Sequence, residues 1–233
     1  MATPANSTPV RDAAARLGVS ERRVRAMIDS GRLPAEKIAG VWWIQRSALA
    51  ARARGEARSG RSLSAGNAWG ALLLASGERD LPWLSRQARW RVSSALRDQG
   101  VAGLIGRLGA RGQARTYSAH PGELRYLGER RELMLTGASA ADAHRLGLHG
   151  GESLDAYVSS DALAHVVEEH ALEEVPLGDS GNVVLRAVPS ALWERVGRRV
   201  APLAAVLIDL AESDDPRSRR VGTQRLEELD GRS

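Results

Sequence analysis

The sequence feature that most constrains this chain is a pair of short amphipathic segments near the amino terminus, joined by a glycine. The first segment, residues 10–17, reads VRDAAARL and places its small and apolar residues on one helical face. Gly18 then breaks the helix, because glycine accepts the backbone angles of a tight turn. The small side chain of Ala14 lets a second helix cross at close range. We therefore expect two short helices packed at an angle.

The second segment follows Ser20, a residue suited to accept a hydrogen bond at a helix amino terminus. Its apolar residues Val24, Met27 and Ile28 recur at helical spacing, and Gly31 favours the left-handed end of a helix. Two short helices joined by a glycine-containing turn are typical of the helix-turn-helix unit, whose second helix can enter the major groove of DNA. The pattern predicts a DNA-binding module.

The outward face of the second helix is rich in arginine. When the apolar residues point inward, Arg22 points outward, and Arg23 and Arg25 lie on the flanks. We expect Arg22 and Arg25 to donate paired hydrogen bonds to guanine, and Ser20 and Arg23 to bind phosphate near the helix start. In the alternative interpretation these arginines only form the solvent-exposed face of the helix and bind no ligand.

A β-hairpin is expected next. Residues 37–38 and 41–44 can pair across a two-residue turn and form a wing, and a third helix begins at Ser47. Alternation along the strand sends Trp42 to the core and Trp43 to the opposite face. Trp43 then stacks on a sugar or on another domain, unless it completes the core.

Residues 10–50 resemble the winged helix-turn-helix of excisionase and MerR-type proteins. The resemblance rests on AAARLGVSERRVR together with GRLP and GVWWI, and it covers roughly a sixth of the chain. One difference is Val41, where the family often carries a basic wing residue. The candidate DNA-binding residues are Ser20, Arg22, Arg23, Arg25, Arg32, Lys37, Trp43 and Arg46.

Charge is divided unevenly along the chain. Residues 1–117 hold 20 Lys and Arg against 8 Asp and Glu, whereas residues 118–233 hold 13 against 20. Salt screens electrostatic fields beyond roughly 10 Å at 0.1 M, so local charge decides which part meets a polyanion. Double-stranded DNA is therefore expected at the amino-terminal half.

Other classes of protein are disfavoured by what the sequence lacks. The chain has no cysteine, which excludes disulfides, thiolate nucleophiles and cysteine-ligated zinc. No apolar run approaches the ~18 residues of a membrane span. We expect a cytoplasmic protein that does not contact membranes.

We divide the chain into a winged helix-turn-helix at residues 8–52, a basic linker at 53–64, and two further modules at 65–118 and 119–233. The linker is rich in Arg, Gly and Ser, and either follows the DNA backbone or serves as a plain tether. The expected fold is mixed α+β and predominantly helical.

The module at residues 65–118 is predicted to be helical, and one interpretation of its pattern is a second winged-helix-like unit. Helices are expected from Asn67, over residues 81–97 with Trp90 on the apolar side, and near 101–108, followed by an extended segment at 114–118. The module either extends the basic surface or is a helical connector with solvated arginines. The arginines concerned are Arg86, Arg89, Arg91 and Arg97.

Residues 119–233 predict an acidic α/β domain. Strands are expected at residues 133–136, 154–158 and 183–188. Helices are expected from Ser139 through His144, at 161–170 and at 202–212, and Asp215 caps a last helix at 216–229.

An enzymatic alternative concerns this α/β domain. Nucleotidyltransferases follow a Gly/Ser turn with two alternate carboxylates that hold magnesium. Here Asp155 is followed at that spacing by Tyr157, so the clamp is incomplete. The five histidines are scattered without metal-ligand spacing. We expect no catalytic residues, no metal and no cofactor, and keep a degenerate nucleotidyltransferase-like protein as an alternative.

Residues 65–230 are similar to antitoxins of the AbiE type IV system, through HPGEL, LTGASAADAH, LDAYV and VAPLAAVLIDLAESDDPRSRR. The similarity implies a repressor of its own operon that opposes a nucleotidyltransferase toxin encoded nearby, although the usual amino-terminal domain of that class is not excisionase-like. An excisionase-like architectural protein that bends DNA is the other alternative. No sustained heptad pattern indicates a coiled coil, so the oligomeric state stays open.

Overall fold

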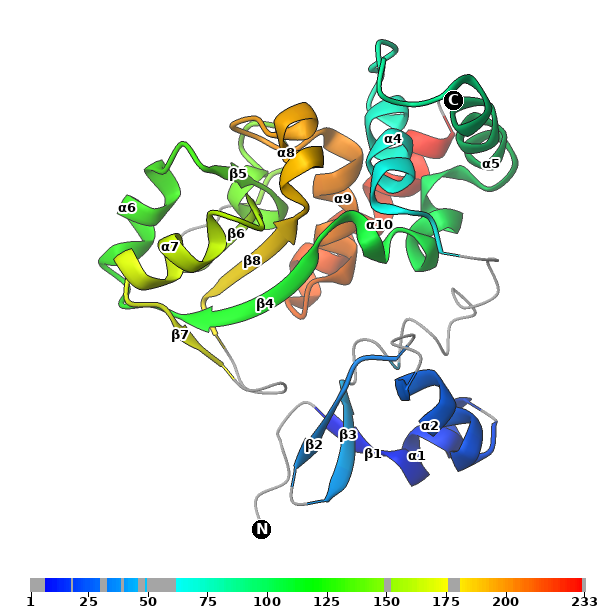
Figure 1. Cartoon of the computed structure of the whole chain (residues 1–233), viewed down its shortest axis with the longest axis vertical. Helices are drawn as coiled ribbons and strands as arrows, with labels where there is room; N and C mark the ends of the chain where they lie inside the picture. The colour runs from blue at the N-terminus through cyan, green and yellow to red at the C-terminus, as the bar shows by residue number, and fades with distance from the viewer. Residues whose placement is uncertain are drawn as a thin grey trace. The chain divides into compact units, whose positions relative to one another are not determined.

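The computed structural model describes residues 7–17, 19–29, 33–38, 40–45, 49, 62–148, 152–175 and 181–231. The chain divides into two compact units (Figure 1), which we call unit 1 (residues 1–58 with 175–180) and unit 2 (residues 59–174 with 181–233). Both units combine helices with a sheet, in agreement with the mixed fold class expected from the sequence.

Unit 1 contains the two predicted helices and the predicted hairpin. Its elements are α1 (Val10–Leu17), α2 (Glu21–Asp29), β2 (Ala35–Ile38), β3 (Val41–Gln45) and a strand that was not expected, β1 (Ser7–Pro9). The sheet order is β1-β3-β2, and β3 is antiparallel to both neighbours. Lys37 lies opposite Trp42 and Ile38 opposite Val41, which is the predicted hairpin register.

The core of unit 1 is built from the faces that the sequence pattern predicts. Ala13 and Val24 are fully buried where α1 crosses α2, and Ile44 joins them from β3. Trp42 packs half-buried against this core, whereas Val41 is 47% exposed. The predicted helix ends at Gly18 and Gly31, and the cap at Ser47, lie outside the described residues.

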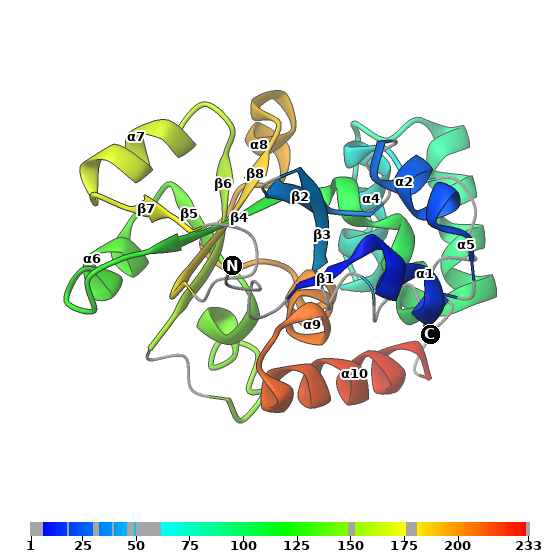
Figure 2. The same ribbon diagram turned by 90° about the horizontal axis from the view of Figure 1, so that it is seen from below.

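Unit 2 is a three-layer α/β/α structure. Its sheet has the order β5 (Leu133–Leu135), β6 (Leu154–Ser159), β8 (Val183–Val188), β4 (Gln113–Ser118) and β7 (Glu173–Glu174). The β6 and β8 strands are parallel, and the other pairs are antiparallel. Figures 1 and 2 show α6 (Glu123–Glu129) and α7 (Leu163–Glu169) together on one side of this sheet.

The other face of the sheet is covered by a larger group of helices. They are α4 (Ala65–Ala75), α5 (Arg86–Leu104), α8 (Ser190–Val196), α9 (Leu203–Glu212) and α10 (Pro216–Asp230). Alternation along β6 serves both layers, because Ala156 and Val158 face the α6–α7 side while Tyr157 faces the α9 side. Asp215 caps α10 as predicted, accepting a hydrogen bond of 2.7 Å from the Ser218 amide.

The sequence-based division after residue 118 is not seen in the structure. The β4 strand pairs with β8, and α4 and α5 share one hydrophobic core with α9 and α10. Residues 65–118 therefore do not form a separate winged-helix-like module but belong to the same continuous unit as residues 119–174. The linker also ends earlier than predicted, because Leu63 donates to the Arg107 carbonyl at 3.0 Å and Ser64 caps α4.

Three local predictions also differ from the structure. Trp90 is 66% exposed rather than part of the apolar face. The helix expected from Ser139 is a single 3₁₀ segment at Gly137–Ala140, and the Ser139 hydroxyl accepts a bond from the Asp155 amide instead of capping a helix. The third predicted helix begins within α5, after a kink at Gly100. Among the described residues, no helix is both long and apolar enough to cross a membrane.

Candidate nucleic-acid interface

Ser20 fixes the start of α2. Its hydroxyl oxygen accepts a hydrogen bond of 3.3 Å from the Arg23 amide, and its carbonyl accepts from Val24 at 3.1 Å. Because Ser20 is exposed and its hydroxyl hydrogen remains free to donate, the cap residue can also bind a phosphate oxygen.

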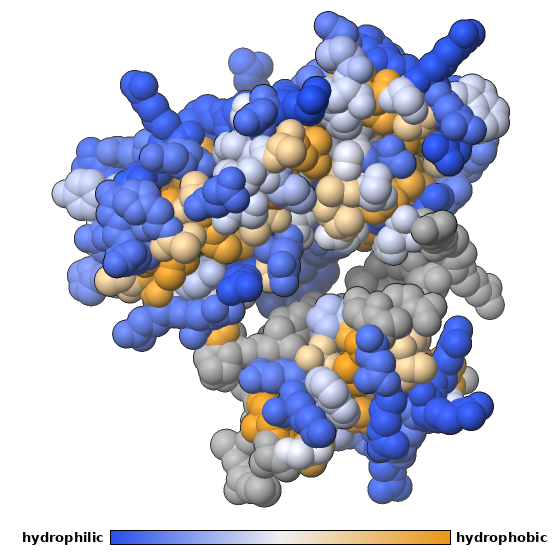
Figure 3. Space-filling model, in the orientation of Figure 1, coloured by the Kyte–Doolittle hydropathy of each residue, from blue (hydrophilic) through white to orange (hydrophobic). Residues whose placement is uncertain are grey.

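Burial on one side of α2 orients the arginines on the other. Val24 and Met27 are 0% and 3% exposed, while Arg22, Arg23 and Arg25 are all exposed. Figure 3 shows hydrophilic side chains over the α1 and α2 part of unit 1. The side chains proposed for DNA contact therefore point to solvent rather than into the unit.

The three arginines differ in what they contact. Arg22 and Arg23 have no ion-pair or side-chain hydrogen-bond partner among the described residues, so their charges are uncompensated. Arg25 pairs with Glu21, one turn earlier, at 3.1 Å between Nη2 and Oε2. Both members of this pair are about half exposed, and such pairs contribute at most ~1 kcal/mol, so DNA can compete for Arg25.

Residues 10–57 match a protein-family model described as a helix-turn-helix domain. Unit 1 thus carries a helix-turn-helix DNA-binding domain. No curated protein and no solved structure gives a significant match to the chain. The match covers the paired helices and the hairpin whose geometry is given above.

The wing of the helix-turn-helix domain carries the remaining described candidates. The Lys37 ammonium lies 5.9 Å from the centroid of the Trp42 ring, a cation–π contact at an exposed position. Trp43 is half-buried on the opposite strand face, in register with Pro9 and Glu36. Arg32 and Arg46 lie outside the described residues.

Two further cations in the helix-turn-helix domain were not among the predicted residues. Arg11 and Arg16 are exposed on α1, and neither has a partner in the described part of the chain. They lie on the helical face opposite the buried Ala13 and Ala14, so the helical pattern of α1 could have predicted that they point to solvent. Unit 1 holds 11 Lys and Arg against 6 Asp and Glu, which makes it the basic unit.

Unit 2 contains a buried ionic cluster between its sheet and α9. Asp209 is fully buried, and its carboxylate accepts from Arg111 at 2.8 Å and from Thr136 at 2.6 Å; Arg186 Nε lies 3.3 Å away. Burial alone would raise the pKa of Asp209, but Arg186 and Arg111 outweigh it and hold the pKa below its ordinary value.

The residues of the enzymatic alternative belong to this same cluster. Asp155 forms an ion pair with Arg186, and burial raises the pKa of Asp155 despite that pair. Tyr157 is fully buried, and its hydroxyl accepts a bond of 3.1 Å from Arg111. A metal clamp needs free carboxylates, but here Arg111 and Arg186 occupy the surroundings of Asp155. Among the described residues, no group of three or more His, Asp or Glu side chains is placed to hold a metal ion.

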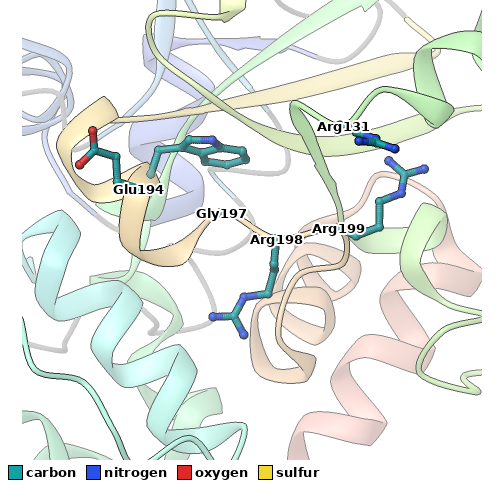
Figure 4. A pocket seen from close by; sticks show the side chains of 6 residues that line it. Arg131, Glu194, Gly197, Arg198 and Arg199 are labelled. Atoms are coloured by element: carbon teal, nitrogen blue, oxygen red, sulfur yellow. The ribbon is translucent and has the colours of Figure 1, made fainter.

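Unit 2 also has an open pocket of about 530 Å³, shown in Figure 4. Arg198 in this pocket pairs with Glu78, and Arg199 donates to the backbone carbonyls of Arg130 and Gly128. Two of its three arginines thus already have partners within the chain. The lining residues are Arg131, Trp193, Glu194, Gly197, Arg198 and Arg199.

Proposed function

We propose that the protein is a sequence-specific transcriptional regulator that represses its own operon, as the antitoxin-like member of a type IV toxin–antitoxin pair in the cytoplasm. The uncompensated, exposed Arg22 and Arg23 on α2 carry the DNA-binding part of this proposal. The antitoxin part comes from the similarity of residues 65–230 to AbiE antitoxins. A nucleotidyltransferase toxin encoded nearby is the proposed protein partner.

Within the proposed complex, Arg22 reads a base edge and Arg23 binds phosphate. Both residues lie in the first turn of α2. Arg22 projects from the middle of the exposed face, which suits a base edge in the major groove, whereas Arg23 lies on the flank of that face, which suits phosphate. Arg25 reads a second base after it exchanges Glu21 for guanine. The proposal includes no catalytic step, because Asp155 is already neutralised by Arg186.

Fluorescence anisotropy with a labelled duplex from upstream of the operon tests the DNA-binding part. The Arg22→Ala/Arg25→Ala variant should bind about tenfold or more weakly, because one paired arginine–guanine contact is worth about 1–3 kcal/mol. Arg125→Ala/Arg195→Ala is the matched control, since it removes two exposed arginines from α6 and α8 of unit 2. Equal affinity of the wild type and the double variant would reject the assignment of α2.

Copurification of the chain with the products of neighbouring genes tests the antitoxin part. A nucleotidyltransferase that stays bound through two columns supports the proposal. If the neighbouring product is an integrase and the protein bends its duplex in a circular-permutation assay, the excisionase-like alternative is favoured instead.

A further inference from the structure

The first three turns of α5 concentrate positive charge on a unit that has no net charge overall. Residues 86–97 contain four arginines and no Asp or Glu. Unit 2 as a whole holds 22 Lys and Arg against 22 Asp and Glu, so its net formal charge is zero. The basic residues of α5 are therefore a local feature and not a consequence of overall composition.

Helix geometry places an exposed tryptophan among these arginines. Ala88 and Val92 are buried against the core of unit 2, which turns Trp90 outward to 66% exposure. Arg86 and Arg97 lie one turn before and two turns after Trp90 on the same face. Figure 3 shows mostly hydrophilic side chains over the α5 edge of unit 2.

The charges on this face are free to meet a ligand. Arg86, Arg91 and Arg97 have no ion-pair or hydrogen-bond partner in the described part of the chain. Arg89 differs, because it donates to the carbonyls of Arg79 at 2.6 Å and Leu81 at 3.0 Å. These contacts hold its side chain in place, but no carboxylate takes part in them. The nearest acid on α5, Asp98, lies beyond the arginine run.

The exposure of Trp90 is not explained by folding. Trp69 in the same unit is fully buried, and Trp83 is half-buried against the core. Leaving a large aromatic side chain in water loses roughly 25 cal/mol for each Å² of apolar area that could be buried. Nucleic acids combine the two groups that fit this face, since arginine neutralises phosphates and an indole packs on sugars and bases.

We propose that Arg86, Trp90, Arg91 and Arg97, which we call the α5 face, form a second DNA-contacting surface that binds the backbone of the duplex held by the helix-turn-helix domain. The choice of duplex DNA rests on the proposed function. A single small module buries only ~600–1,000 Å² on DNA, so tight binding needs a second contact. Attachment to the same chain supplies that contact at high effective concentration.

Titration of the full-length chain with the upstream duplex at several salt concentrations tests the proposal. Arg86→Gln/Arg97→Gln should weaken binding about tenfold at low salt and reduce the slope of log K against log salt by about 1.8, or ~0.9 for each lost phosphate contact. Arg125→Gln/Arg195→Gln removes the same charge from α6 and α8 of unit 2 and should change neither quantity by as much.

The outcomes separate this inference from the proposed function. Loss of binding in both Arg22→Ala/Arg25→Ala and the α5 variant supports both proposals. If the α2 variant weakens binding while the α5 variant matches its control, the α5 face is overturned and the regulator proposal stands. If the α2 variant has no effect, the assignment of α2 fails, and the α5 variant alone then decides whether α5 binds DNA.

Tryptophan fluorescence provides a direct readout. Adding duplex should quench the emission of Trp90, so the quenching seen in the wild type should be smaller in Trp90→Phe. The Trp83→Phe variant should show the same quenching as the wild type. Because Trp90 is exposed, its replacement leaves the core of unit 2 intact, and circular dichroism checks this. Equal quenching in the wild type and Trp90→Phe would overturn the proposal.

Discussion

Asp209 lies in a helix that is otherwise apolar, and the contacts of its carboxylate explain why. The α9 helix reads LAAVLIDLAE, and Asp209 is fully buried. Its carboxylate accepts from Arg111, lies within ion-pair distance of Arg186 on β8, and accepts from Thr136 beyond β5. Trp69 holds the first of these in place, because its indole donates to the Arg111 carbonyl at 2.7 Å. One carboxylate thus ties α9 to the sheet.

Replacing Asp209 with Asn should destabilise unit 2 strongly. The change removes the counter-charge that Arg111 and Arg186 share and leaves them with Glu212 and Asp155 as their remaining partners. Breaking a buried pair from one side typically costs about 3–5 kcal/mol, and the remaining partners favour the lower end of this range. Chemical denaturation followed by far-UV circular dichroism measures this loss. A variant that loses less than ~1 kcal/mol would mean that the cluster does not hold α9 to the sheet.

The contacts of Asp209 with Arg111 and Arg186 also predict that the stability of unit 2 depends on pH. The folded-state pKa of Asp209 lies below its ordinary value of 3.8, so the stabilisation is present above pH 4 and is lost as pH falls through the folded-state pKa. The difference in free energy of unfolding between wild type and Asp209→Asn should therefore be largest near neutral pH and shrink below pH 4. A difference that stays constant down to pH 2 would contradict the assignment.

Sequence reasoning could have noted Asp209 but not its partners. A single acid inside an apolar helix indicates a buried polar contact. The identity of that contact is not a local property, because Arg111 lies 98 residues away and is brought near by packing of the whole unit. The spacing of Asp155 and Tyr157 did correctly indicate a shared strand face, yet the arginines that neutralise Asp155 were not foreseen.

At the scale of elements, α5 consists of two helices joined at Gly100. The φ angle of Gly100 is +66°, and the second helix starts with its Val101 and Ala102 amides bound to the Asp230 carboxylate at 2.6 and 3.0 Å. The end of α10 therefore caps the second half of α5. This contact joins segments that are 129 residues apart.

Removing this cap should destabilise unit 2 by a moderate amount. Asp230→Ala leaves two helix-start amides without their acceptor, and losing such a cap typically costs about 0.5–2 kcal/mol. Gly100→Ala should cost more, because its Cβ would lie 2.3 Å from the Asp230 carboxylate at a left-handed backbone angle. Gly109→Ala, whose Cβ would meet nothing within 4 Å, is the control for both in thermal unfolding.

The α2 helix gives a prediction on binding. Glu21→Gln removes both the partner of Arg25 and a negative charge beside the proposed phosphate contacts. Affinity for the upstream duplex should rise, by about two- to fivefold because exposed pairs are worth ~1 kcal/mol or less. Glu168→Gln on α7 is the control for loss of one exposed carboxylate. Lower affinity in Glu21→Gln would place Glu21 in a required contact.

Elements that form within a short stretch of sequence were predicted well. The α1–α2 pair and the β2–β3 hairpin follow from periodicity within about 40 residues. The sequence pattern places β4 in the wrong module, because its partner β8 follows only after α6, β5, the 3₁₀ segment, β6, α7 and β7. The β1 strand is only three residues long and ends in proline, so no alternation could indicate it. Trp90 is expected on the apolar side of its helix, but at 100° per residue it lies opposite Ala88 and Val92, so helical spacing alone could have shown that it faces solvent.

At the scale of the whole molecule, each unit has a hydrophobic core of its own. The core of unit 1 lies between α1, α2 and β3, and unit 2 has cores on both faces of its sheet. We expect scanning calorimetry to resolve two unfolding transitions, and Asp209→Asn to lower only the one that belongs to unit 2.

Duplex added to the full-length chain then reports which unit holds it. A ligand stabilises what it binds, by about 2.7 kcal/mol when present at 100 times its dissociation constant, so the transition of unit 1 should move to higher temperature. If the α5 face also binds the duplex, the transition of unit 2 should rise as well, and Arg86→Gln/Arg97→Gln should abolish only that second shift. A duplex that raises neither transition would contradict DNA binding, and one that raises only the transition of unit 1 would confine the contact to the helix-turn-helix domain.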